Sequence, residues 1–117
     1  MNGHTHRVVG GIVGGAAYLL ATKALGLEPT VTGLAVSVGV GVIGSSLHDF
    51  VEPAAHPNHR AFFHSIAATG ALAVSLRRCW LSTALGADQK ALLMVGGLAC
   101  MSHPCLDALT PKGLPII

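Results

Sequence analysis

Ionisable side chains are concentrated in one short stretch of an otherwise apolar chain. The twenty residues from Ser46 to Ser65 hold four of the seven histidines, together with Asp49, Glu52 and Arg60. Only 10% of the residues in the whole chain are charged, so this concentration is not needed for solubility. Imidazole and carboxylate groups together favour zinc, manganese or iron over calcium or magnesium. The stretch therefore predicts most of a metal site.

A second pair of candidate ligands lies near the end of the chain. His103 and Asp107 are spaced i and i+4, so both project from one face of a helix. His59 and His64 flank the predicted entry to another helix, with His64 in its first turn. A metal held by such groups activates a bound water near neutral pH, which is the chemistry of hydrolysis.

The composition is that of a membrane protein. Soluble domains have about a quarter charged residues, whereas this chain has 10% and a mean hydropathy of +0.63. Its 117 residues predict a single domain, 1–117. The formal net charge of +2 and 4% aromatic content, without a basic patch, argue against a nucleic-acid partner. The three cysteines lack CxxC spacing and are interpreted as small buried hydrophobic residues.

Four apolar segments follow one another: Val8–Leu27, Val31–Leu47, Phe62–Leu76 and Ala91–Leu109. Each segment is of marginal length, because a membrane span needs roughly 20 residues. All four, however, lack the charged face that helices of a soluble bundle would show. Pairs of small residues four apart, such as Gly10 and Gly14, permit close helix packing and a homo-oligomer. We therefore predict an all-α integral membrane bundle of about four transmembrane helices, with the lipid bilayer as its partner.

Four crossings would bring every histidine to one membrane face, because the chain alternates sides. Histidines scattered for packing would not sort in this way. The histidines predicted to share that face are His4, His6, His48, His56, His59, His64 and His103.

Simpler interpretations stay open for the same residues. His4 and His6 could be a polar terminus, and His48 and His56 could lie at the interface or support the ligands. His59, His64, His103 and Asp107 could form a hydrogen-bonded network that caps helices. Asp49 could cap a helix, and Glu52 could pair with Arg60.

Four motifs occur in a defined order along essentially the whole chain. Gly3-His4, or His6, precedes the first apolar segment, and Leu47-His48-Asp49 follows the second. The third motif, from His59-Arg60 to His64-Ser65, leads into the third segment. The last motif begins in the fourth segment with Ser102-His103, includes Asp107, and continues beyond that segment with Thr110-Pro111, Gly113 and Pro115. This order resembles the YdjM-type family of inner-membrane, metal-dependent hydrolases. The chain departs from the family pattern at His48, which replaces a proline, and at Val51, which replaces a second aspartate.

The resemblance implies a bacterial inner-membrane hydrolase that acts on a phosphoester or ester at the membrane surface, for example a phospholipid. One or two divalent ions, zinc above manganese or iron, would be bound by His4, His6, Asp49, His64, His103 and Asp107. His59 or Glu52 would act as general base or acid, and Arg60 would clamp a phosphate. The motif order is also distantly similar to the zinc-dependent phospholipase C and single-strand nuclease superfamily.

Three non-enzymatic functions are alternatives. Loss of the second aspartate at Val51 suggests a catalytically degenerate protein that keeps its metal for structure or for a partner. A haem-binding bundle would need histidines that face each other within the helices, and here most lie at helix ends beside carboxylates. A metal transporter would need ligands at mid-membrane or on both faces, and the opposite face, Arg77–Lys90, offers only Cys79.

Overall fold

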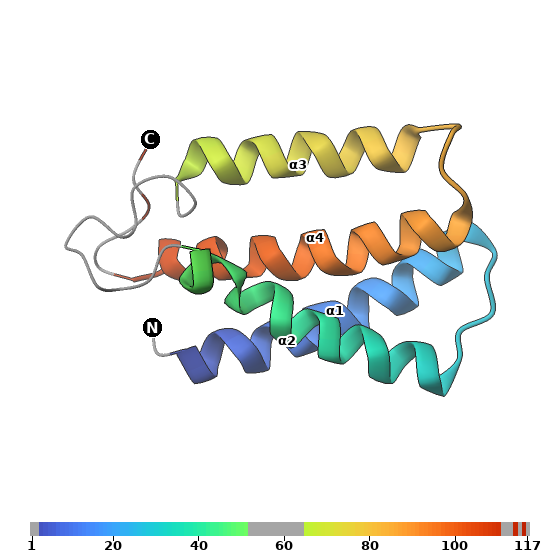
Figure 1. Cartoon of the computed structure of the whole chain (residues 1–117), viewed down its shortest axis with the longest axis horizontal. Helices are drawn as coiled ribbons and strands as arrows, with labels where there is room; N and C mark the ends of the chain where they lie inside the picture. The colour runs from blue at the N-terminus through green and yellow to red at the C-terminus, as the bar shows by residue number, and fades with distance from the viewer. Residues whose placement is uncertain (1–2, 52–64, 111–113, 115, 117) are drawn as a thin grey trace.

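The protein is an all-helical bundle. The computed structural model describes residues 3–51, 65–110, 114 and 116, and within these ranges it contains no strand. Its helices are α1 (Gly3–Leu25), α2 (Val31–Val51), α3 (Ile66–Leu81) and α4 (Ala87–Ala108). Helices α1, α2 and α4 pack against one another, whereas α3 contacts α4 alone among the described helices (Figure 1). The predicted fold class is therefore confirmed.

Three of the helices are long and apolar enough to cross a membrane. They are α1, α2 and α4, with hydropathies of 1.6, 1.5 and 1.3. Helix α3 has 16 residues and is shorter than the usual span of about 20. The helices alternate in direction, so the start of α1, the end of α2, the start of α3 and the end of α4 lie at one end of the bundle (Figure 1). We call this the cluster end.

Small residues let α1 and α2 approach closely. Gly10 and Gly14 of α1 face the stripe of Ser37, Gly41 and Ser45 on α2, and all five residues are buried. A Cβ atom added at Gly14 would overlap the carbonyl oxygen of Ser37, and one added at Gly41 would overlap that of Gly10. The four-residue glycine spacing therefore packs two helices together, as it commonly does in membranes.

A capped turn connects these two helices. Gly26 has a φ of +68°, and the amide of Leu27 donates a hydrogen bond of 2.9 Å to the carbonyl of Thr22. This left-handed glycine and the bond back into the last turn form a helix C-cap. The Tyr18 hydroxyl accepts a hydrogen bond of 3.0 Å from the amide of Thr30, which ties the far side of the turn to α1.

The predicted boundaries of α1 and α2 were too short at the cluster end. Helix α1 begins at Gly3, and not at Val8, while α2 continues past Leu47 to Val51. Apolar content marks only the part of a helix that lies in hydrocarbon, and the polar turns beyond it remain helical. His6, His48 and Asp49 are therefore helical residues.

The later segments are shifted along the chain. Helix α3 begins at Ile66 because the Ser65 side chain caps it, accepting from the Ala68 amide at 3.1 Å. The prediction that His64 lies in the first turn of this helix falls outside the described residues. Helix α3 also continues beyond Leu76, through the two arginines at 77 and 78, to Leu81, while α4 begins at Ala87 and not at Ala91.

The close crossing of α1 and α2 should be sensitive to one added methyl group. We expect Gly41→Ala to destabilise the protein by about 1–3 kcal/mol, because the new Cβ overlaps backbone that cannot move aside. Gly39→Ala is the matched control, since a Cβ there meets nothing within 4 Å. Thermal unfolding in detergent, followed by circular dichroism, measures both variants. Equal stability of the two would contradict the close packing.

Candidate metal centre

Buried histidine and aspartate side chains from two helices converge at the cluster end. His6 comes from the first turns of α1, and His103 and Asp107 come from the last turns of α4. Each offers one ligand atom, and these three atoms lie within 4.8 Å of one another. The exposed fractions of the three residues are 3%, 1% and 1%. We call His6, His103 and Asp107 the buried trio.

The spacing within the trio suits a shared ion better than direct hydrogen bonds. Nε2 of His6 lies 3.5 Å from Oδ1 of Asp107, and Nε2 of His103 lies 3.5 Å from Oδ2 of the same carboxylate. Hydrogen bonds from N–H to oxygen are usually about 2.7–3.2 Å long. Two ligands bound at about 2.0–2.1 Å to a tetrahedral zinc ion are about 3.3 Å apart. These two nitrogen-to-oxygen separations are therefore close to those of ligands that share one metal ion.

The main-chain carbonyl of Ser45 fixes the tautomer of His103. Nδ1 of His103 contacts this carbonyl oxygen, which can only accept a hydrogen bond, so Nδ1 carries the proton and donates it. In a neutral imidazole, Nε2 then holds a lone pair directed at the carboxylates. Metal-binding histidines commonly donate their second ring N–H to a carbonyl in this way.

A stack of imidazole rings holds His103 in place. The rings of His6 and His103 have centroids 3.8 Å apart and an interplanar angle of 16°. His48, from α2, stacks on His103 at 5.3 Å with an angle of 15°, and its Nδ1 lies 3.6 Å from Sγ of Cys100. Two charged rings at this separation would repel each other. The stack is therefore unfavourable for two charged rings, and the neutral imidazole is the form that binds metals.

Asp49 lies at the accessible edge of the trio. Its Oδ1 is 3.4 Å from Nε2 of His103, and 52% of its side chain is exposed. His4 is exposed on α1 and is not a member of the trio. Of the predicted metal ligands, the structure thus brings together His6, His103 and Asp107, with Asp49 beside them. The remaining predicted site residues lie outside the described residues: Glu52, His59, Arg60 and His64.

Three residues near the trio were not among the predicted site residues. His48 and Cys100 flank His103 from one side, and Ser45 contacts it through its backbone. Ser45 precedes Asp49 by four residues and so shares a helical face with it, which is a usable signal. The contact itself leaves no signal in the sequence, because a main-chain carbonyl is the same for every residue type.

The fold and the trio define a class: a small helical membrane protein with a buried His/Asp group able to hold a metal ion at one end of its bundle. The family described as YdjM inner membrane protein matches residues 1–117, so the chain belongs to that family. It is accordingly an inner-membrane protein, as predicted. No curated protein and no solved structure gives a significant match to the chain. The distant similarity to the phospholipase C and nuclease superfamily stays a prediction.

Metal binding by the trio should stabilise the fold. We expect zinc to raise the thermal unfolding temperature of the purified protein, by the equivalent of about 2.7 kcal/mol at a free concentration one hundred times Kd. His6→Ala should abolish this rise, because it removes one of the three buried ligand atoms. His4→Ala should keep it, since that side chain is exposed nearby on the same helix. A rise that is unchanged in His6→Ala would exclude the trio as the site.

Proposed function

We propose that the protein is a membrane-bound, metal-dependent hydrolase that acts on a phosphoester or ester at the membrane surface. The observation that carries the proposal is the convergence of three buried ligand atoms from His6, His103 and Asp107 within 4.8 Å. Nitrogen and carboxylate ligands in a small set favour zinc, with manganese and iron as the other candidates. The site would hold one ion, or two if further residues contribute.

Charge balance supports a divalent ion at this place. A carboxylate as deeply buried as Asp107 is costly in a membrane protein unless a positive charge accompanies it. Asp49 brings a second carboxylate to the same histidine, His103. The two negative charges together match one divalent cation, while the histidine rings remain neutral.

Three ligands from the trio would leave one coordination position of a bound metal free. Three protein ligands are typical of catalytic zinc, whose fourth position is open to water or substrate. Bound zinc supplies an activated water at neutral pH and polarises the oxygen of the bond to be cleaved. The half-exposed carboxylate of Asp49 marks the side from which a substrate would arrive. Asp49 would either complete the coordination or accept a proton from the attacking water.

The stretch that joins α2 to α3 would supply the remaining groups. It follows the end of α2 and precedes the start of α3, and both of these helix ends lie at the cluster end (Figure 1). His64 would add a ligand, as the family motif implies. His59 or Glu52 would act as general acid or base, and Arg60 would bind a phosphate through two parallel hydrogen bonds. A phospholipid head group is the substrate that best suits a site at a membrane face.

A second candidate function is a catalytically degenerate protein that keeps its metal for structure or for a partner. Two observations favour it. Val51 occupies the position of the second aspartate in the family motif. The trio is also nearly closed, with exposed fractions of 1–3%, which restricts the access of a substrate.

Turnover on chromogenic phosphomonoesters, phosphodiesters and carboxylic esters tests the proposal. We expect hydrolysis by the purified protein in detergent that is lost after chelation and restored by zinc. Asp107→Asn should reduce it to background, because the amide removes the buried negative charge while keeping the size of the side chain. Asp88→Asn, at the exposed opposite end of the same helix, should retain full activity.

The alternative has a distinct outcome in the same experiment. Protein that binds one equivalent of zinc through the trio, yet hydrolyses none of the three ester classes, would support the degenerate metal-binding function. Activity that survives both chelation and Asp107→Asn would contradict the proposed metal-dependent mechanism itself.

A further inference from the structure

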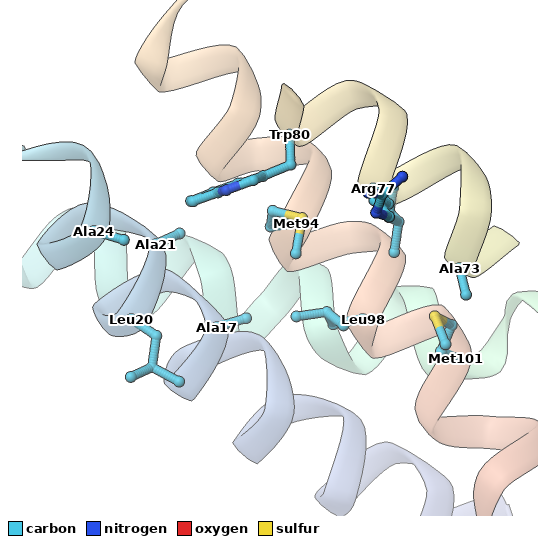
Figure 2. Close-up of a pocket in the computed structure, with 11 residues that line it drawn as sticks. Ala17, Leu20, Ala21, Ala24, Ala73, Arg77, Trp80, Met94, Leu98 and Met101 are labelled. Atoms are coloured by element: carbon cyan, nitrogen blue, oxygen red, sulfur yellow. The ribbon is translucent and has the colours of Figure 1, made fainter. Parts of the chain in front are cut away.

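A large apolar cavity lies between α1, α3 and α4. Its volume is about 520 Å³, and residues from all three helices line it (Figure 2). It exists because α3 contacts α4 but not α1 among the described helices. The α1 side of the cavity presents small alanines, among them Ala17, Ala21 and Ala24, which leave the space unfilled. None of the His/Asp cluster residues lines it.

Hydrocarbon is the occupant that the lining favours. Apart from Arg77, the lining side chains are apolar, including Leu98 of α4 and Trp80 of α3. Water needs two to four polar partners in a cavity, and such partners are scarce here. Two of the helices that line the cavity, α1 and α4, are long and apolar enough to cross a membrane, so the surrounding medium is lipid. The volume lies in the range of ordinary ligand pockets, about 300–1,000 Å³.

The lining of the cavity includes one positive charge. Arg77 lies on the last turns of α3, is exposed, and has no ion-pair partner among the residues that the structure describes. Trp80 follows on the next turn and extends across α4 toward Ala21 and Ala24 of α1 (Figure 2). Tryptophan and arginine near a helix end are typical of the membrane interface. A guanidinium at that depth suits a lipid phosphate, which it can bind through two hydrogen bonds.

We propose that this cavity binds one acyl chain of an anionic phospholipid, whose phosphate is held by Arg77. The lipid would fill the gap that α3 leaves against α1 and so fix the position of the most loosely packed helix. Arg77 is near the end of α3 that lies opposite the cluster end (Figure 1). The site is therefore separate from the candidate metal centre, and it does not depend on the proposed hydrolase function.

Trp80 makes the proposal directly measurable, because it is the single tryptophan of the chain. The full chain is reconstituted in phosphatidylcholine vesicles that contain either brominated phosphatidylglycerol or brominated phosphatidylcholine, at equal mole fraction. Bromine on an acyl chain quenches tryptophan fluorescence on contact. We expect stronger quenching by the anionic brominated lipid, since Arg77 enriches it in the cavity.

Two variants separate the site from a general effect of charge. Arg77→Gln should remove the difference between the two brominated lipids. Arg78→Gln removes the same charge from a neighbouring residue that does not line the cavity, and it should keep the difference. Ala21→Leu fills the cavity from α1 and should lower the quenching of Trp80 by both lipids. This variant tests the cavity itself, because the charge of Arg77 is unchanged.

Three results would overturn the proposal. Equal quenching of the wild-type protein by the two lipids would show that the cavity does not select an anionic head group. If Arg77→Gln and Arg78→Gln both lost the difference in quenching between the two lipids, that difference would come from the general positive charge of this membrane face and not from the cavity. Trp80 that neither lipid quenches would show that protein, such as a second copy of the chain, covers the cavity.

Discussion

Ser45 is the point on which the candidate metal centre depends, because three helices meet there. The residue is completely buried on α2, and a Cβ at Gly10 of α1 would overlap its side chain. Its carbonyl oxygen accepts the Nδ1 hydrogen of His103 from α4. A glycine at position 10 therefore allows α1 to approach, and this approach brings His6 against the ring of His103. The close packing of small residues at the helix crossing therefore also sets the positions of the side chains in the site.

The nitrogen-to-oxygen distances in the cluster are longer than those expected of an ion-pair network that only caps helices. In such a network, a protonated His103 would donate to the carboxylates through charge-assisted bonds of about 2.7–2.9 Å. The separations from its Nε2 are instead 3.4 Å to Asp49 and 3.5 Å to Asp107. Stacking against His6 is also unfavourable for two charged rings. The proposed divalent ion, with neutral imidazoles and two carboxylates around it, would agree with these distances and with the charge balance.

Much of this arrangement could be predicted from the sequence, for physical reasons that can be named. Apolar segments without a charged face identify membrane helices, and their even number brings His6 and His103 to the same end of the bundle. The i, i+4 spacing of His103 and Asp107 identifies a shared helical face. Helix ends were predicted less well, because hydropathy cannot separate a polar helical turn from a loop. The backbone contact of Ser45 and the cavity beside Trp80 depend on how helices are spaced, which no local pattern records.

X-ray absorption spectroscopy at the metal edge tests the central claim most directly, using protein purified from membranes and loaded with one equivalent of zinc. The account predicts nitrogen and oxygen neighbours at about 2.0–2.1 Å, with the outer-shell scattering of imidazole rings. It also predicts no sulfur at about 2.3 Å, since the ligands are His6, His103 and aspartate oxygens. A sulfur shell would assign the metal to the cysteines, and the absence of imidazole scattering would remove the trio as the metal site.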